Sequence, residues 1–424
     1  MDGHRQPQGG EARRRRSGRF RYAPSAASAA GWVGRTDRQL FTPPAEEAFE
    51  YNVGEVNYLT GEGVNIGGFL FPELFFIGTG GVSEPGADFG DFAFTEHDPQ
   101  NEIAVQAIEV ELFLNLNDVV TGLIAGSGFQ VENQVWEAEL EEAFLHFQLT
   151  DNIAIGGGQF LNTFGFVADQ HVHGWDFVNH NVANGRMLNE GHLITQGGEV
   201  LVSTPNSGLL TLALGGVRTH SHEHEEEEDH DEEHHLEADD AGFNDWVFSA
   251  DYKFRLPFDD SILMSTSIAT GENGFGGDTN LFGVGLQKVW NGHDHGGGGA
   301  DFCTGALMFR TEFFGREVEA IHEDGDVDKF DDYGLSTLLA YGLSDATTLS
   351  FRHDWVSSAE ALELADTHRF SPALTAFVDP EQRVRVRFQY DHVQSSSVGS
   401  EHVGWLQVQV QWGGQGGSHA NHNH

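Results

Sequence analysis

The strongest constraint on this chain is an alternation of apolar and polar side chains that persists over long segments. In NDWVFSADYKFRL (residues 244–256) one face is aromatic and apolar, while the other carries mostly polar and charged residues. QRVRVRFQY (382–390) and WLQVQVQW (405–412) repeat the pattern. Period two places the two sets on opposite faces of a β-strand, and segments of about ten residues suit strands that cross a membrane at a tilt. The side chains predicted to face lipid are Trp246, Phe248, Tyr252, Phe254, Val384, Val386, Phe388, Val408 and Val410.

The connections between these segments predict how the strands are joined. Tight turns such as TPNSG, PFDDS, LSDA and VDPEQ alternate with long connections at 162–196, 219–242 and the acidic stretch 317–332. Outer-membrane barrels combine short periplasmic turns, long external loops and an even number of strands. The predicted fold is therefore an all-β transmembrane antiparallel barrel. Its sixteen strands are expected near 64–77, 103–117, 119–129, 135–149, 152–161, 197–204, 208–218, 244–257, 260–271, 279–290, 302–316, 334–343, 346–358, 366–378, 382–394 and 402–412.

One of these segments changes phase. In WEAELEEAFLHFQL (136–149) the polar face set by Glu137, Glu139 and Glu141 becomes apolar at Ala143, Leu145 and Phe147. A β-bulge adds one residue to a strand and shifts the faces in this way. The sequence is consistent with a bulge here or with a different strand boundary.

The two ends of the chain lack the strand pattern. Residues 1–60 are expected to be a basic, disordered segment, either the remnant of a leader or a plain tail, because small residues follow an arginine cluster but the apolar core of a signal is weak. Residues 61–413 are assigned to the barrel, and the Gly- and His-rich residues 414–424 to a periplasmic tail.

Charge and cysteine content limit the classes of function. Nine of the 22 basic residues lie in the first 40 positions, so residues 41–424 carry 13 basic and 63 acidic groups. Such a body repels nucleic acid. The acidity suits either the capture of cations or a high-salt habitat. The single cysteine, Cys303, leaves histidine and carboxylate as the donors for any metal.

A histidine tract, HSHEHEEEEDHDEEHH (220–235), lies in one of the expected external loops. It has no apolar residue around which to fold, and dense imidazole and carboxylate suit borderline divalent ions such as zinc. The alternatives are a polyanionic loop in which histidine is incidental, or a pH-sensitive gate. The candidate ligands are His220, His222, His224, His230, His234 and His235.

Further histidines recur along the chain. His171 and His173 form an H-x-H motif in the long 162–196 connection and are added to the candidate metal ligands. His293 and His295 form a second motif, HDH. Each pair taken alone also fits an incidental role.

A set of charged side chains is expected to line the lumen. Opposed rings of arginine and carboxylate orient solutes in pores, while simple pairing of buried opposite charges is the alternative. The candidates are Arg383, Arg385, Arg387, Arg352 and Arg310, with Glu109, Glu111, Asp251 and Glu312 facing them.

Residues 141–205 resemble a group of bacterial outer-membrane proteins described as zinc-regulated receptors or porin-like barrels. The matching features are a Glu-Ala-aromatic strand, a Gly-x-Phe strand, an FG pair at Phe164 and Gly165, an H-x-H-x-W-x-F loop from His171 to Phe177, and a return strand with Gly198. The resemblance implies an outer-membrane location and zinc as the ligand. Energy-coupled receptors carry a plug domain that residues 1–60 cannot supply, so passive or loop-assisted passage is expected.

Two functions remain in competition. The first is a channel that binds a divalent cation at external His/acidic loops and passes it through a polar lumen, with zinc as the ion that the imidazole and carboxylate donors favour. The alternative is a general or anion-selective porin whose acidic loops reflect a high-salt habitat. No catalytic spacing stands out, so an enzyme is not expected. The expected partners are outer-membrane lipid and divalent cations. A homo-oligomer is possible, and the sequence does not determine the oligomeric state.

Overall fold

The computed structural model describes the barrel from residue 69 to residue 413. Within that range it leaves out residues 85–88, 118, 206–207, 219–238, 292, 295–299, 302–303, 322–326, 360–361, 363, 380–381 and 397–398. The expected N-terminal segment, the histidine tract and the C-terminal tail therefore lie outside the described residues.

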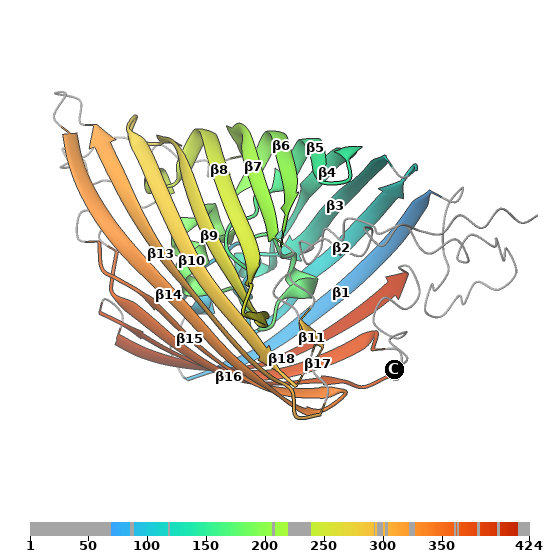
Figure 1. Ribbon diagram of the computed structural model, residues 1–424. Coiled ribbons are helices and arrows are strands. Elements are labelled where there is room, and N and C mark those ends of the chain that lie inside the picture. Colours follow the sequence, from blue (N-terminus) through green and yellow to red (C-terminus); the bar gives the residue numbers. More distant parts are fainter. Residues whose placement is uncertain are drawn as a thin grey trace, which may run out of the picture. The chain divides into compact units, whose positions relative to one another are not determined.

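In the described part of the chain, sixteen antiparallel strands form one closed barrel (Figure 1). Each strand pairs with its neighbour along the chain, and β1 closes the barrel against β18, with Phe76 opposite Val410. The strands are β1 (Leu70–Ser83), β2 (Ile103–Asn115), β3 (Val120–Gln130), β4 (Trp136–Thr150), β5 (Ile153–Leu161), β6 (Ile194–Thr204), β7 (Gly208–Val217), β8 (Phe243–Leu256), β9 (Asp259–Asn273), β10 (Asp278–Trp290), β13 (Leu307–Ile321), β14 (Val327–Ser344), β15 (Thr347–Val356), β16 (Thr367–Phe377), β17 (Val384–Ser395) and β18 (Gly399–Gly413).

The remaining elements lie in the connections. A two-stranded sheet of β11 (His293–Asp294) and β12 (Ala300–Asp301) interrupts the connection between β10 and β13. The only α-helix in the described part of the chain is α1 (Val182–Met187), and the 3-10 turns are η2 (Phe89–Phe92), η3 (Glu132–Gln134), η4 (Val172–Gly174), η5 (Asn189–Gly191) and η6 (Asp239–Ala241). None of the described helices is long and apolar enough to cross a membrane.

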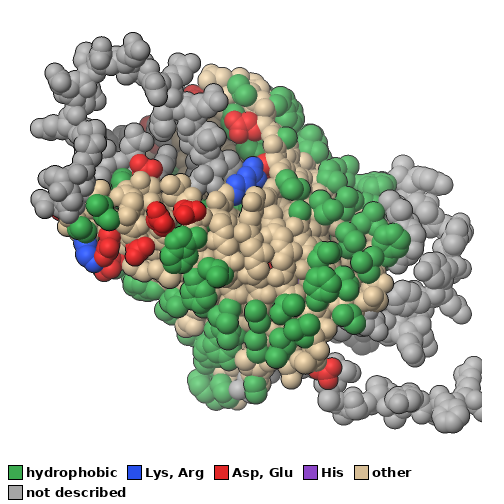
Figure 2. All heavy atoms as spheres, turned by 90° about the horizontal axis from the view of Figure 1, so that it is seen from above, with side chains coloured by type: hydrophobic (Ala, Val, Ile, Leu, Met, Phe, Trp, Pro, Cys, Tyr) green, Lys and Arg blue, Asp and Glu red, His purple; other side chains and the backbone are tan. Residues whose placement is uncertain are grey.

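The outer surface carries the alternating apolar residues, as predicted. On β17, Phe388 is 56% exposed while its neighbours Arg387 and Gln389 are buried. On β8, Trp246 is exposed whereas Val247 is buried. Hydrophobic side chains spread over much of the face seen in Figure 2. Closure satisfies the backbone hydrogen bonds of every strand, which is the condition for crossing lipid without helices.

All sixteen predicted strands are present, but one expected loop is largely strand. The acidic stretch 317–332 contains the end of β13 and the beginning of β14, which pair as far as Ile321 and Val327. The outward side chains of Glu317, Glu319, Lys329 and Asp331 are polar, and Lys329 forms an ion pair with Glu319 across the two strands. A strand that extends beyond the lipid has water on its outer face, so it loses the apolar signature by which we identified strands.

The phase change in β4 is a β-bulge. Ala125 of β3 pairs with Glu142, and the next residue, Gly126, pairs with Leu140, so Glu141 is the additional residue. The bulge directs two consecutive carboxylates, Glu141 and Glu142, into the barrel, where both are buried.

A charge on the outer wall tests the assignment of the lipid face. We expect Phe388→Arg to destabilise the folded barrel by about 2–4 kcal/mol, because an arginine in the middle of the lipid-facing wall has to leave water. Urea-dependent unfolding in bilayers, followed by gel migration, measures the change.

The matched control is Phe258→Arg in the short turn between β8 and β9. Phe258 is 82% exposed. An arginine at such a rim position costs about 0–1 kcal/mol. Equal destabilisation by the two substitutions would contradict the assignment of Phe388 to the lipid-facing wall.

Candidate functional site

The connection between β5 and β6, residues 162–193, folds into the barrel (Figure 1). Most of its side chains are buried, including Phe164, Phe166 and Val182 at 0% exposure. The turn into α1 is capped by Asn181, whose side chain accepts a hydrogen bond from the backbone N–H of Asn184. We call residues 162–193 the inner loop.

Arginines from one side of the barrel bind the inner loop through its carbonyl oxygens. Arg387 donates to the carbonyls of Phe177 (2.6 Å) and Trp175 (2.7 Å). Arg385 donates to the carbonyl of His173 at 2.8 Å. These guanidiniums therefore hold the backbone of the loop in place through hydrogen bonds.

Two more predicted arginines contact the same loop. Arg352 of β15 donates to the carbonyl of Asn179 at 2.8 Å and to its side chain at 2.7 Å. Arg310 of β13 pairs with Asp176 at 2.6 Å. Arg369 of β16, which the sequence analysis did not single out, is fully buried and donates to the carbonyl of His180. We call Arg310, Arg352, Arg369, Arg385 and Arg387 the arginine wall.

Arg383 lies apart from this wall. It occupies the turn before β17 and donates to the carbonyl of Gly413 at the end of β18, at 2.7 Å. In the sequence Arg383 belongs to the same alternating run as Arg385 and Arg387, so the pattern predicted a position in the lumen for all three. The strand begins only at Val384, so Arg383 contacts the rim of the barrel instead of the inner loop.

Carboxylates of the barrel wall bind the N–H groups of the loop. Glu109 of β2 accepts from the backbone N–H of Val172 at 2.9 Å and of His173 at 3.2 Å. Glu312 of β13 and Asp251 of β8 likewise accept from the N–H groups of Phe166 and Gly165. The carbonyl oxygens of the loop thus accept hydrogen bonds from guanidiniums and its N–H groups donate to carboxylates, and these charge-assisted hydrogen bonds fix the orientation of the loop.

His171 lies at the centre of the acidic side. Its Nδ1 contacts Glu141, and its Nε2 lies 3.1 Å from Glu142 Oε2. The ligand atoms of Glu109, Glu141 and His171 all lie within 4.8 Å of one another. The β4 bulge creates this arrangement, because it brings two adjacent carboxylates to the two nitrogens of one imidazole.

His173 lies beside this group. Its Nδ1 is 2.9 Å from Glu109 Oε2 and 3.7 Å from Glu111 Oε1, and its ring stacks on Phe75. The predicted residues Glu109, Glu111, His171 and His173 are therefore brought together, although they come from positions about 60 residues apart.

A second group was missed by the sequence analysis. His97, in the connection between β1 and β2, has its Nε2 at 3.1 Å from Glu139 and 3.5 Å from Glu96. The ligand atoms of these three residues also lie within 4.8 Å of one another. The motif Glu96-His97-Asp98 was the signal available in the sequence, but Glu139 could be added only with the barrel in hand.

The buried histidines of the two connections fall into two electrostatic classes. Burial alone lowers the pKa of His97, but the hydrogen bond to Glu139 and the charge of Glu96 outweigh it and raise the pKa to about 10. His171 is buried as well, and the charge of Glu141 raises its pKa well above the ordinary value. Burial lowers the pKa of His192 to about 4. Histidines near the acidic side therefore hold protons that a bound cation would displace.

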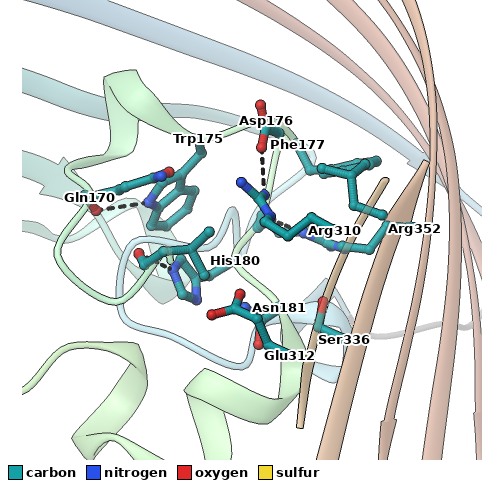
Figure 3. A pocket seen from close by; sticks show the side chains of 13 residues that line it. Gln170, Trp175, Asp176, Phe177, His180, Asn181, Arg310, Glu312, Ser336 and Arg352 are labelled. Atoms are coloured by element: carbon teal, nitrogen blue, oxygen red, sulfur yellow. Dashed lines mark hydrogen bonds and ion pairs between the residues drawn. The ribbon is translucent and has the colours of Figure 1, made fainter. Parts of the chain in front are cut away.

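A recess lies on the arginine side of the inner loop, with an empty volume of about 360 Å³ (Figure 3). Arg310 reaches Asp176 across it, and Arg352 lies over the ring of Phe177 at 4.3 Å. Glu312 points into the recess from the strand wall. Guanidiniums, carboxylates and aromatic rings thus line this recess together.

The class of protein follows from the closed sixteen-stranded wall with an apolar exterior and a charged interior, which is an outer-membrane barrel. The outer-membrane channel DcaP of Acinetobacter baumannii is similar in structure, with a TM-score of 0.52 over 83% of this chain and 100% of that one, at 10% identity. The outer-membrane protein OmpT of Vibrio cholerae matches with a TM-score of 0.50 over 81% of this chain and 97% of that one, at 11% identity. These likenesses are to the fold.

No family model matches the chain, and no curated protein matches it. The resemblance of residues 141–205 to zinc-regulated outer-membrane proteins thus stays a prediction.

Proposed function

We propose that this protein is an outer-membrane channel whose lumen binds a divalent cation, with zinc as the preferred ion, beside the inner loop. The observation that supports the proposal most directly is the arrangement around His171, where an imidazole and the carboxylates of Glu109 and Glu141 converge. Nitrogen and oxygen donors in a small group of three or four suit zinc and its neighbours among the transition metals. Calcium prefers oxygen alone and a larger number of ligands.

The external histidine tract at 220–235 forms the second part of the proposal. Its six histidines would raise the local concentration of the ion at the mouth of the barrel, and the luminal group would bind the ion next. Acidic side chains in both places attract cations over longer distances.

A general or anion-selective porin is the alternative, and the arginine wall favours it. Arg310 and Arg352 line the recess on that side of the inner loop. An anion in that recess would meet these two guanidiniums. Reversal potentials in a salt gradient across a planar bilayer would distinguish the two functions, since they give the sign of the permeant ion.

Zinc is expected to block the single-channel current carried by potassium, whereas equal calcium leaves it almost unchanged. His171→Asn should weaken the block by at least about tenfold, which is the lower end of the effect of removing even an outer-shell partner of a metal ligand. Current without zinc should stay normal, because asparagine retains a polar side chain toward Glu142.

His146→Asn is the matched control. His146 is also a buried luminal histidine beside a carboxylate, with its Nε2 2.7 Å from Glu199, but it belongs to neither group of three potential ligands. Its zinc block should equal that of the unchanged protein. A channel that zinc does not block, or one in which the two variants behave alike, would leave the general porin.

A further inference from the structure

Glu141 lies between the two groups of potential metal ligands. Its Oε2 contacts Nδ1 of His171, while its Oε1 lies 3.8 Å from Nε2 of His97. Glu141 is 4% exposed, and Oε1 has no hydrogen-bond partner among the described residues. A buried carboxylate oxygen without such a partner costs free energy, so its position between two imidazoles calls for a physical reason.

The group on the His97 side has the composition of a metal site in its own right. His97 is 3% exposed and supplies one imidazole nitrogen, with Glu139 and Glu96 supplying oxygens around it. The carboxylate of Glu139 is held in place by Arg218, which lies outside this group and binds its second oxygen, Oε2, at 3.0 Å. The edge of Phe129 packs against the imidazole and limits how the ring can turn.

The β4 bulge explains why one residue reaches both groups. In a strand of regular alternation, without a bulge, Glu139 and Glu141 would both face the lumen and Glu142 would point to lipid. With it, the carboxylates of Glu139, Glu141 and Glu142 form a continuous row from His97 to His171. A carboxylate has two oxygens and can bind one ion with each.

We propose that Glu141 bridges two divalent cations, one bound by His97, Glu96 and Glu139, and the other by His171 and Glu109. For the second of these ions the inference rests on the proposed function. Two like charges on one bridge repel each other, so the arrival of the second ion weakens the hold on the first. Adjacent sites that exchange ions in this way allow passage where a single tight site would retain its ion.

The test uses the full-length protein with the six tract histidines changed to asparagine, loaded with copper(II). Two copper ions on one carboxylate give a coupled electron paramagnetic resonance spectrum with a half-field transition, and distant ions do not. The expected result is this coupled signal, with equilibrium dialysis showing two ions more than a variant that lacks both His97 and His171.

Single variants separate the two sites. His97→Asn and His171→Asn should each lose the coupled signal and one ion, and keep the other. Glu141→Gln should lose the signal and weaken the binding of both ions, because it removes the bridging charge at nearly constant shape. His146→Asn should keep the signal and both ions.

The outcomes also separate this inference from the proposed function. If the protein bound a single ion, and this ion were lost in His171→Asn but kept in His97→Asn, the bridging role of Glu141 would be overturned. The proposed function would stand. One ion that is lost only in His97→Asn, with zinc block unaffected by His171→Asn, would overturn the function as assigned to His171. Two ions without coupling would overturn the bridging role of Glu141.

Discussion

Replacing Arg385 and Arg387 together by serine is expected to raise the single-channel conductance several-fold and to shift selectivity toward cations. The two guanidiniums donate three hydrogen bonds to carbonyls of the inner loop, at 2.6–2.8 Å. Hydrogen bonds to charged groups contribute about 1.5–3 kcal/mol each. Their loss should release the segment from His173 to Phe177 and remove two positive charges from the wall.

The barrel itself should still assemble in this variant. Arg385 and Arg387 face the lumen, and substitutions there tune selectivity, whereas charges on the lipid face destabilise the wall. Arg352 and Arg369 continue to hold the loop at Asn179 and His180, so the release is partial. Conductance and reversal potential are measured at low salt, where screening is weakest.

Arg383→Ser is the matched control from the same run of arginines. Arg383 donates to Gly413 at the rim and not to the inner loop, so conductance and selectivity should change little. An unchanged current in the double variant would mean that the arginines serve only to balance buried charge. If Arg383→Ser changed conductance and selectivity as much as the double variant does, the effect would come from the general loss of positive charge near the pore and not from release of the inner loop.

The strands were predictable from the sequence because each strand in a membrane carries its own signal. Lipid on one side and a polar lumen on the other impose alternation residue by residue, as on β17, where Phe388 faces out and Arg387 faces in. The shift at Glu141 was visible for the same reason, since an additional residue reverses the faces. Where β13 and β14 extend into water the alternation of apolar outward and polar inward side chains is absent, and for this reason residues 317–332 were predicted to be a connection.

The inner loop could not be predicted in the same way. Its backbone groups pair with residues far away in the chain, such as the N–H of Val178 with Gln389, 211 positions distant. Such pairs leave no local period. The predicted Glu109, His171 and Arg387 all contact or lie in the inner loop, but the sequence could not say that the loop lies between Glu109 and Arg387 or that His97 contacts Glu139.

A zinc affinity in the micromolar range or tighter is expected for a peptide covering Thr219 to Asp240, without any need for the barrel. The tract has no apolar anchor, so its six histidines and their acidic neighbours can be studied alone. A peptide with all six histidines changed to asparagine should keep its attraction for calcium and magnesium and lose most of its affinity for zinc. Carboxylates bind the first two ions through charge, whereas imidazole favours zinc.

The affinity of the tract should also fall as the pH drops through about 6.5, the ordinary pKa of histidine. Zinc binds the neutral imidazole, so the proton and the metal compete for the same nitrogen. The sign follows directly: below that pH zinc has to displace a proton from each imidazole that it binds, so the affinity falls and protons are released, whereas above it the imidazoles are already neutral and few protons are released. Calorimetry in buffers of different ionisation enthalpy measures both the affinity and the number of protons released. Equal zinc affinity for the two peptides, or an affinity independent of pH, would leave a polyanionic loop and favour the general porin.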